Sequence, residues 1–167
     1  MRGIMTVFAL TMLTVGAVAA DGSLPNRLDQ VKAGEWLLLK DVSGARIGEL
    51  TKFSVSEVKG EGADKVVVMT IDRYHDEKIE ETRDIEIPVS RYAERMAGLE
   101  ARAKQIGRER LTIKDREIVV VTVTWDDDRE PREIKLWLSD ELPIGGLAKS
   151  WSSDPDFPAA ELVDYGF

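Results

Sequence analysis

The chain has one histidine and no cysteine, which restricts the catalytic chemistry open to it. His75 lies in the segment 74–77, Tyr-His-Asp-Glu, between two strand-like stretches, and this favours a turn. Neither a nucleophile elbow nor an HExxH zinc motif accompanies it. Without cysteine, thiol catalysis, thiolate metal sites and iron–sulfur clusters are excluded. We therefore expect His75 to be a turn residue that is dispensable for any activity.

Neighbouring acidic residues are the candidates for binding a metal ion. Asp126 to Asp128 offers three carboxylates to a hard cation such as calcium. Adjacent residues of one turn cannot all point at the same ion, and the glycine and bidentate glutamate of a calcium loop are missing. We favour a solvated hairpin turn at this position, and we interpret Asp154 and Asp156 in the same way. No metal site is predicted.

Carboxylates in a predicted strand at 78–87 are candidates for acid–base catalysis. Glu81 and Arg83 share one strand face with three isoleucines. If that face is buried, the two form a costly internal pair or line a wet cavity. If a bulge or a frayed end intervenes, they are surface residues, which we favour. A hydrolase acting through Glu81 or Asp84 is our least favoured hypothesis, and we predict no catalytic residue, no cofactor and no enzymatic activity.

The four tryptophans could form a platform for a carbohydrate or a lipid. Trp125 is in phase with a row of valines, and Trp36 shares a face with a leucine, so both are expected in the core. Trp151 stands among serines and is expected to anchor a loop. Trp137 is in phase with Lys135, opposite the apolar row of its own strand. We expect Trp137 either to be exposed or to lie under a second layer of structure.

The elements that must position these residues are mostly strands. Apolar stretches separated by short turns predict seven or eight of them. They cover residues 35–40, 46–59, 65–74, 78–87, 109–113, 117–125, 133–139 and 160–165. A tight connection at 143–147 and a loop at 152–158 lie between the last two strands.

One amphipathic helix is predicted over 91–106, with Ser90 as its N-cap and Gly107 at its end. Its apolar residues recur at steps of four and three, and they are Tyr92, Met96, Leu99, Ala103 and Ile106. This stripe needs an apolar partner, so we expect Met96 and Leu99 to be buried against the sheet. The pattern predicts a single α+β domain in which a strongly curved antiparallel sheet packs against one helix.

Residues 1–20 have the pattern of a secretory signal peptide. Arg2 supplies the positive charge, 4–15 is an apolar stretch too short to span a bilayer, and 17–20 offers small residues for cleavage. We therefore expect residues 21–167 to form an exported domain, periplasmic or extracellular. The residue after cleavage is not cysteine, so no lipid anchor is expected, and no other stretch reaches transmembrane length.

The acidic composition bears on the partners of this domain. The chain has 23 Lys and Arg residues against 31 Asp and Glu, a formal charge of −8. Such a surface repels nucleic acid and anionic lipid head groups unless a local basic patch overrides the net charge. We therefore expect a soluble protein that does not bind nucleic acid and has no stable membrane anchor.

The segment 136–149, Leu-Trp-Leu-Ser-Asp-Glu-Leu-Pro-Ile-Gly-Gly-Leu-Ala-Lys, resembles a stretch near the C-terminus of exported bacterial proteins of unknown function. The matching residues are Trp137, Ser139, Pro143, Gly145, Gly146, Leu147 and Lys149, whereas Leu142 stands where valine is usual. An early Gly-x-Trp at 34–36 and a closing strand at 162–166 also fit. These proteins resemble the LolA/LolB-type half-barrel, a curved antiparallel sheet closed by a helix around an apolar cavity for acyl chains.

The resemblance implies an architecture and, by analogy, a function. Our first hypothesis is a non-enzymatic binding protein with an apolar hollow for a lipid-like ligand or a lipidated envelope protein. The alternative is a structural or interaction module of the cell envelope with a filled core and no small ligand. Candidate ligand or partner residues are Trp137, Lys149, Met96 and Leu99.

The turn at 143–149 is expected to be structural. Pro143, Gly145 and Gly146 would fix how the last strand closes the sheet, since glycine permits positive φ and close approach. Lys149 could meet an anionic head group at the mouth of a cavity, although an ordinary solvated lysine is the favoured interpretation.

The predicted signal peptide leads to a testable prediction about the N-terminus of the exported protein. Protein recovered from the exported fraction should begin at Ala20 or Asp21, because cleavage follows the small residues at 17–20. N-terminal sequencing checks this. An intact Met1 on protein from the soluble cytoplasm would contradict it.

Overall fold

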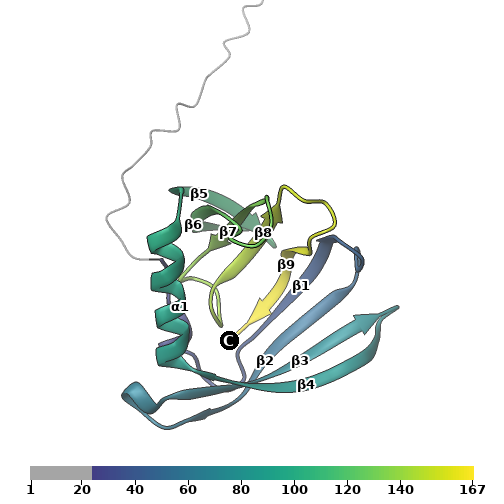
Figure 1. The fold of residues 1–167 in the computed structure, drawn as a ribbon. Helices are drawn as coiled ribbons and strands as arrows, with labels where there is room; N and C mark the ends of the chain where they lie inside the picture. Colours follow the sequence, from purple (N-terminus) through teal and green to yellow (C-terminus); the bar gives the residue numbers. More distant parts are fainter. Residues whose placement is uncertain (1–23) are drawn as a thin grey trace, which may run out of the picture.

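The computed structural model describes residues 24–167, and the predicted leader lies outside them. Nine strands and one α-helix make up this part of the chain (Figure 1). The strands are β1 (Trp36–Ser43), β2 (Leu50–Lys59), β3 (Val66–His75), β4 (Lys78–Pro88), β5 (Gln105–Ile113), β6 (Arg116–Asp126), β7 (Glu133–Leu138), β8 (Leu147–Ser152) and β9 (Ala159–Gly166). The helix, α1, covers Val89–Arg102.

All nine strands belong to one antiparallel sheet. Their order is β4-β3-β2-β1-β9-β8-β7-β6-β5, so β4 and β5 are the two edge strands and the sheet is not closed. The predicted α+β class and antiparallel sheet are confirmed. Each hairpin joins strands that neighbour in sequence, while β9 pairs with β1 and brings the end of the domain beside its first strand.

The helix α1 connects the two edges of this sheet. It begins directly after β4 and ends two residues before β5. In Figure 1 it runs along one side of the molecule, with β3 and β4 towards its lower end and β5–β8 towards its upper end. Met96 and Leu99 are both 8 % exposed and pack in a cluster with Val123 and Leu138 of β6 and β7. The prediction that the helical stripe is buried against the sheet is therefore confirmed.

The helix is shorter than predicted. It ends at Arg102, because Ala103 is extended (ψ 129°) and the Lys104 N–H donates to the carbonyl oxygen of Thr124 in β6. Gly107 therefore lies inside β5 rather than ending the helix, and a Cβ there would come within 2.9 Å of the Thr122 hydroxyl. Ser90 is not the N-cap either, since Pro88 occupies that position without a side-chain hydrogen bond.

One strand, β8, was not predicted. Its sequence, Leu-Ala-Lys-Ser-Trp-Ser, contains no β-branched residue and so lacks the usual composition of a strand. It forms because β7 pairs with it on one side, from Ile134 opposite Ser152 to Leu138 opposite Leu147, and β9 pairs with it on the other. Trp151 thus lies in a strand, where it is 42 % exposed, and not in a loop.

The packing of α1 predicts how two neighbouring helical positions respond to substitution. Leu99→Ala should lower the free energy of unfolding by about 2–5 kcal/mol, because it removes buried methyl groups from the cluster with β6 and β7. Gly98→Ala should raise it by roughly 0.5–1 kcal/mol, since a Cβ at this exposed helical glycine meets nothing within 4 Å.

Urea unfolding of the two variants measures both effects. A loss below about 0.5 kcal/mol in Leu99→Ala would show that the stripe is not packed as described.

Candidate functional site

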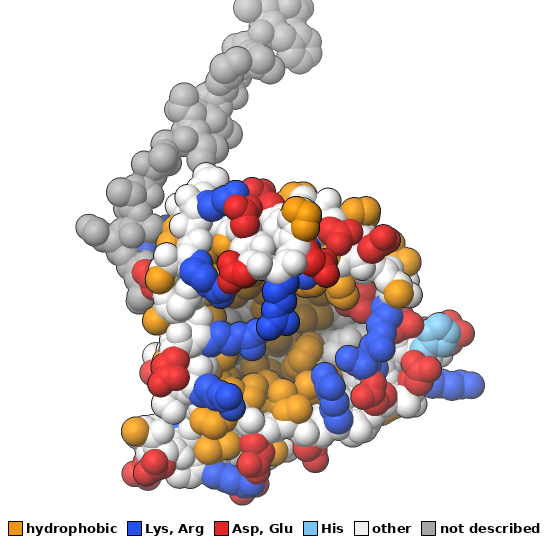
Figure 2. All heavy atoms as spheres, in the orientation of Figure 1, with side chains coloured by type: hydrophobic (Ala, Val, Ile, Leu, Met, Phe, Trp, Pro, Cys, Tyr) orange, Lys and Arg blue, Asp and Glu red, His pale blue; other side chains and the backbone are white. Residues whose placement is uncertain are grey.

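A largely apolar cavity lies between α1 and the sheet. Its volume is about 350 Å³. The strands β1, β2 and β3 supply one wall, α1 supplies a second, and β6 and β7 supply a third. Figure 2 shows it as a hollow floored by hydrophobic side chains and bordered by Lys and Arg side chains.

Simple periodicities place the side chains that line this cavity. Residues two apart in a strand point to the same face, as Leu37 and Leu39 do in β1 and Leu136 and Leu138 do in β7. On α1 the spacing is four and three, and the lining residues are Tyr92, Met96 and Leu99. Phe53 of β2, Met69 of β3 and Trp125 of β6 complete the apolar walls.

Two arginines of α1, Arg95 and Arg102, also line the cavity. Arg102 donates to the Asp128 carboxylate at 2.6 Å and to the carbonyl oxygen of Gly98 at 3.2 Å. Arg95 has no carboxylate within 4.0 Å among residues 24–167. Tyr92, one turn before Arg95, has its phenol pKa raised by burial, while the Arg95 charge acts in the opposite direction. The guanidinium charge of Arg95 therefore reaches into the edge of the apolar site.

A second hollow, of about 380 Å³, adjoins the cavity and shares Phe53 with it. Arg46, Arg73 and Arg83 line it together with Asp41. Burial is the main cause that raises the pKa of Asp41, followed by the neighbouring Glu49 carboxylate, whereas Arg46 and Arg73 act to lower it. This second hollow carries more cationic than anionic side chains.

Two alternatives were left open for Glu81 and Arg83, that they are surface residues or that they line a wet cavity, and the structure contains part of each. Both side chains are exposed, as favoured. Glu81 does not pair with Arg83, because Arg73 on β3 lies opposite it and donates at 2.6 Å. Arg83 instead faces the second hollow. A register shift between Arg73 and Tyr74 separates this part of the face from Ile79.

The four ligand or partner residues predicted from the sequence lie in two separate places. Met96 and Leu99 line the cavity, whereas Trp137 and Lys149 do not. Leu136 and Leu138 face the cavity, so the side chain between them points to the opposite face of β7. There Trp137 is 9 % exposed, its indole N–H donates to Glu109, and Lys149 lies opposite it on β8.

Lys149 is engaged on that opposite face. Its ammonium group pairs with Glu161 of β9 and lies 5.6 Å from the centre of the Trp137 ring. Lys135 lies over the same ring at 4.4 Å. Trp137 thus lies under a layer of charged side chains, and these contacts leave the Lys149 amine remote from the cavity wall.

The turn before β8 borders the cavity. Ile144, Gly145 and Leu147 are lining residues, and the Tyr92 hydroxyl donates to the Gly145 carbonyl oxygen at 3.4 Å. Gly146 has φ of +72°, and a Cβ there would overlap the backbone carbonyl of Ser139. The expectation that this turn needs glycine geometry is confirmed at Gly146.

An ion pair between Arg27 and the buried Glu35, which was not predicted from the sequence, fastens this turn. The Arg27 guanidinium donates to the carbonyl oxygens of Asp140 and Leu142, at 3.1 and 3.2 Å, and lies 3.6 Å from the Glu35 carboxylate. The Glu35 side chain is only 4 % exposed. One pattern could have revealed it, since Glu35 is in phase with the buried Leu37 and Leu39 and so needs a buried cation.

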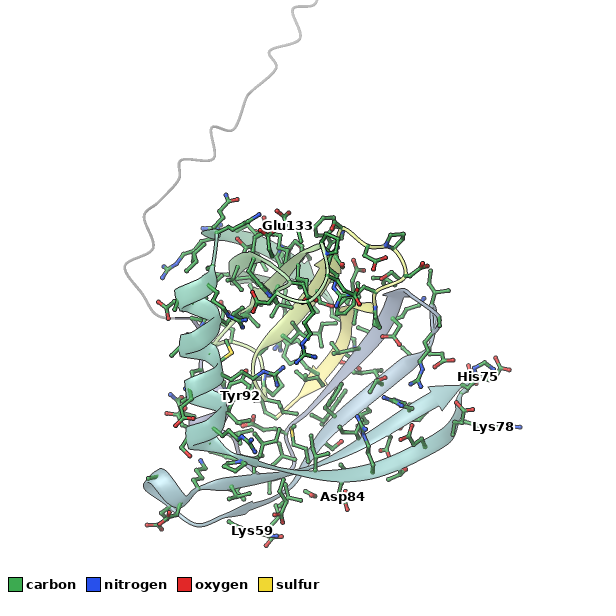
Figure 3. The ribbon with its side chains drawn as sticks, in the orientation of Figure 1. Lys59, His75, Lys78, Asp84, Tyr92 and Glu133 are labelled. Carbon is green, nitrogen blue, oxygen red and sulfur yellow. The ribbon has the colours of Figure 1, made fainter. Side chains whose placement is uncertain are left out.

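The remaining candidates for chemistry lie on the surface. Asp126 and Asp128 each pair with a separate cation, Lys104 at 2.5 Å and Arg102 at 2.6 Å. Within residues 24–167 no group of three or more potential metal ligands occurs. His75 is at the tip of the β3–β4 hairpin, far from Tyr92, as Figure 3 shows. Its ring lies 3.3 Å from the Glu49 carboxylate.

Comparison of the chain with models of protein families and with curated proteins gives no match. Among the helices of the described residues, none has the length and apolar character needed to cross a membrane.

The turn makes a prediction that separates two glycines. Gly146→Ala should lower the melting temperature by several degrees, because the new Cβ would collide with the Ser139 carbonyl at a positive φ. Gly98→Ala is the matched control, since it adds the same methyl group at an unstrained position. Thermal unfolding followed by circular dichroism measures both. Equal stability of Gly146→Ala and the wild type would contradict the described turn geometry.

Proposed function

We propose that this chain is a non-enzymatic, exported binding protein whose cavity holds the apolar part of a lipid-like ligand or of a lipidated partner. The observation that carries the proposal is the lining of the 350 Å³ cavity, in which only Arg95 and Arg102 are charged. Volumes of roughly 300–1,000 Å³ with mostly apolar walls are typical of small-molecule sites. The exported location rests on the leader-like residues 1–20.

An unfilled apolar cavity lowers the stability of a small domain. Apolar surface left unpacked forgoes roughly 25 cal/mol per Å² of burial. Leucine, methionine and aromatic side chains from seven elements converge here without closing the space. A hollow of this kind supports a role in binding an apolar molecule that supplies the missing contacts.

The proposal includes a half-barrel form of the sheet, which the length of α1 supports. Nine strands spaced about 4.8 Å apart would separate the edges of a flat sheet by roughly 38 Å. The 14 residues of α1 span about 21 Å. Ala103 and Lys104 add at most about 7 Å. Since α1 joins β4 to β5, this short reach supports a sheet that bends to bring its edges together.

The pairing of the carboxylates supports a non-enzymatic role. Glu81 accepts a hydrogen bond from Arg73, and Asp84 accepts one from the Thr70 hydroxyl at 2.7 Å. Both lie on β4, and neither lines the apolar cavity. A hydrolase would need such a group next to the bound substrate.

The test is occupancy of the cavity. An uncharged apolar dye, N-phenyl-1-naphthylamine, should bind the wild-type protein with enhanced fluorescence, and native mass spectrometry should detect co-purified lipid. Leu136→Trp should weaken dye binding at least about tenfold, because the larger ring fills space that the ligand needs. Ile79→Trp is the control, since Ile79 is 56 % exposed and lies outside the cavity.

Two results would contradict the proposal. One is a wild-type protein that binds neither dye nor lipid, as expected of an envelope module with a filled core. The other is equal loss of dye binding in Leu136→Trp and Ile79→Trp, which would place the dye elsewhere. Thermal unfolding of both variants checks that each is folded.

A further inference from the structure

The charges around the cavity are opposite in sign to the net charge of the chain. The whole sequence carries −8. Five arginines nevertheless line the cavity and the adjoining hollow, and they are Arg46, Arg73, Arg83, Arg95 and Arg102. Asp41 is the only carboxylate among the described residues that line either space. Figure 2 shows Lys and Arg side chains around the rim of the hollow.

Three of these arginines have no ion pair within the described part of the chain. Arg102 is engaged with Asp128 and Arg73 with Glu81, both at 2.6 Å. Arg46, Arg83 and Arg95 have no carboxylate oxygen within 4.0 Å in residues 24–167. Elsewhere on the surface, cations such as Arg110 and Lys104 are paired with carboxylates. Four more arginines, Arg91, Arg108, Arg116 and Arg129, also lack such a partner in residues 24–167, but they line neither space. Arg46, Arg83 and Arg95 are thus the unpaired guanidinium groups that border the cavity and the adjoining hollow.

The position of Arg95 is the most informative of the three. It directly precedes Met96 and is four residues before Leu99, so it lies at the edge of the apolar stripe of α1 and lines the same cavity. A guanidinium group binds carboxylate or phosphate through two parallel hydrogen bonds. Arg95 is exposed, so an anionic group at the mouth of the apolar cavity can reach its guanidinium from solvent.

We propose that the ligand is an anionic amphiphile, whose apolar chain occupies the cavity and whose carboxylate or phosphate head group binds Arg95, with Arg46 and Arg83 in the adjoining hollow. This inference rests on the proposed function and adds the charge of the ligand to it. It differs from the expectation based on net charge, by which anionic lipid head groups are repelled. Repulsion by the distant acidic surface is screened within about 10 Å at 0.1 M salt, whereas the arginines act at contact.

The test compares amphiphiles that share one acyl chain and differ in head group. Lysophosphatidylglycerol and the free fatty acid are anionic, lysophosphatidylcholine is zwitterionic, and the monoacylglycerol is neutral. Each competes with N-phenyl-1-naphthylamine for the wild-type protein, below its critical micelle concentration. Both anionic amphiphiles should displace the dye at concentrations about tenfold lower than the other two. The two anionic arms show whether phosphate or carboxylate is preferred.

Arginine variants test which side chain causes the preference for anionic amphiphiles. Arg95→Gln should weaken binding of the anionic amphiphiles about tenfold more than it weakens binding of the dye or of the neutral amphiphile. Arg83→Gln should weaken them less, and Arg95→Lys should retain part of the preference because it keeps the charge. Arg110→Gln is the control, since Arg110 is exposed on β5 and pairs with Glu117 away from the cavity.

The outcomes separate this inference from the proposed function. Equal displacement by anionic, zwitterionic and neutral amphiphiles, or an unchanged preference in both Arg95→Gln and Arg83→Gln, would overturn the inference and leave an apolar binding site in place. Failure of the dye and of every amphiphile to bind would overturn the proposed function itself.

Discussion

The rest of the structure depends on one constraint, that a single 14-residue helix connects the two edges of a nine-stranded sheet. The helix leaves β4 without a loop and reaches β5 after two residues, so it cannot move away from either edge. Its apolar stripe must then face the same side of the sheet as the inward residues of β1, β3 and β7. The cavity is the space that remains between these surfaces, and its walls are apolar because each element turns its apolar face inward.

A second tie fixes the wall formed by the turn before β8. The partly buried Arg27 contacts the buried Glu35, directly before β1, and donates to two carbonyl oxygens of 140–142, so the N-terminal segment, β1 and the turn are joined at one point. A buried ion pair adds little net stability compared with apolar residues, but removing one partner leaves an uncompensated charge. The same turn brings Gly145 against Tyr92, where the Cβ of any larger residue would come within 2.5 Å of the hydroxyl. The turn thus forms part of the cavity wall and also connects β7 to β8.

Local patterns predicted most of the elements, and long-range pairing accounts for the rest. The stripe through Met96 and Leu99 is visible because helical periodicity is a property of neighbouring residues. The strand β8 was not predicted because Trp151 alone among its six residues favours a strand, and it forms by pairing with β7 and β9. The helix end was misplaced because a hydrogen bond from Lys104 to β6 decides it. The arginines around the two hollows could not be foreseen, because Arg95, Arg46 and Arg83 come from separate elements, which only the fold places around adjoining spaces.

The central claim, that an acyl chain lies between α1 and the sheet, can be tested with two methyl groups. Met69 on β3 and Met96 on α1 are the only methionines after residue 20, and both line the cavity. In protein labelled with ¹³C at the methionine methyls, nuclear Overhauser effects to a bound acyl chain report its position. Cross-peaks from both methyls to the same chain are predicted. Saturating amphiphile that gives no cross-peak to either methyl, with contacts at the Trp137 ring on the opposite face instead, would contradict the account.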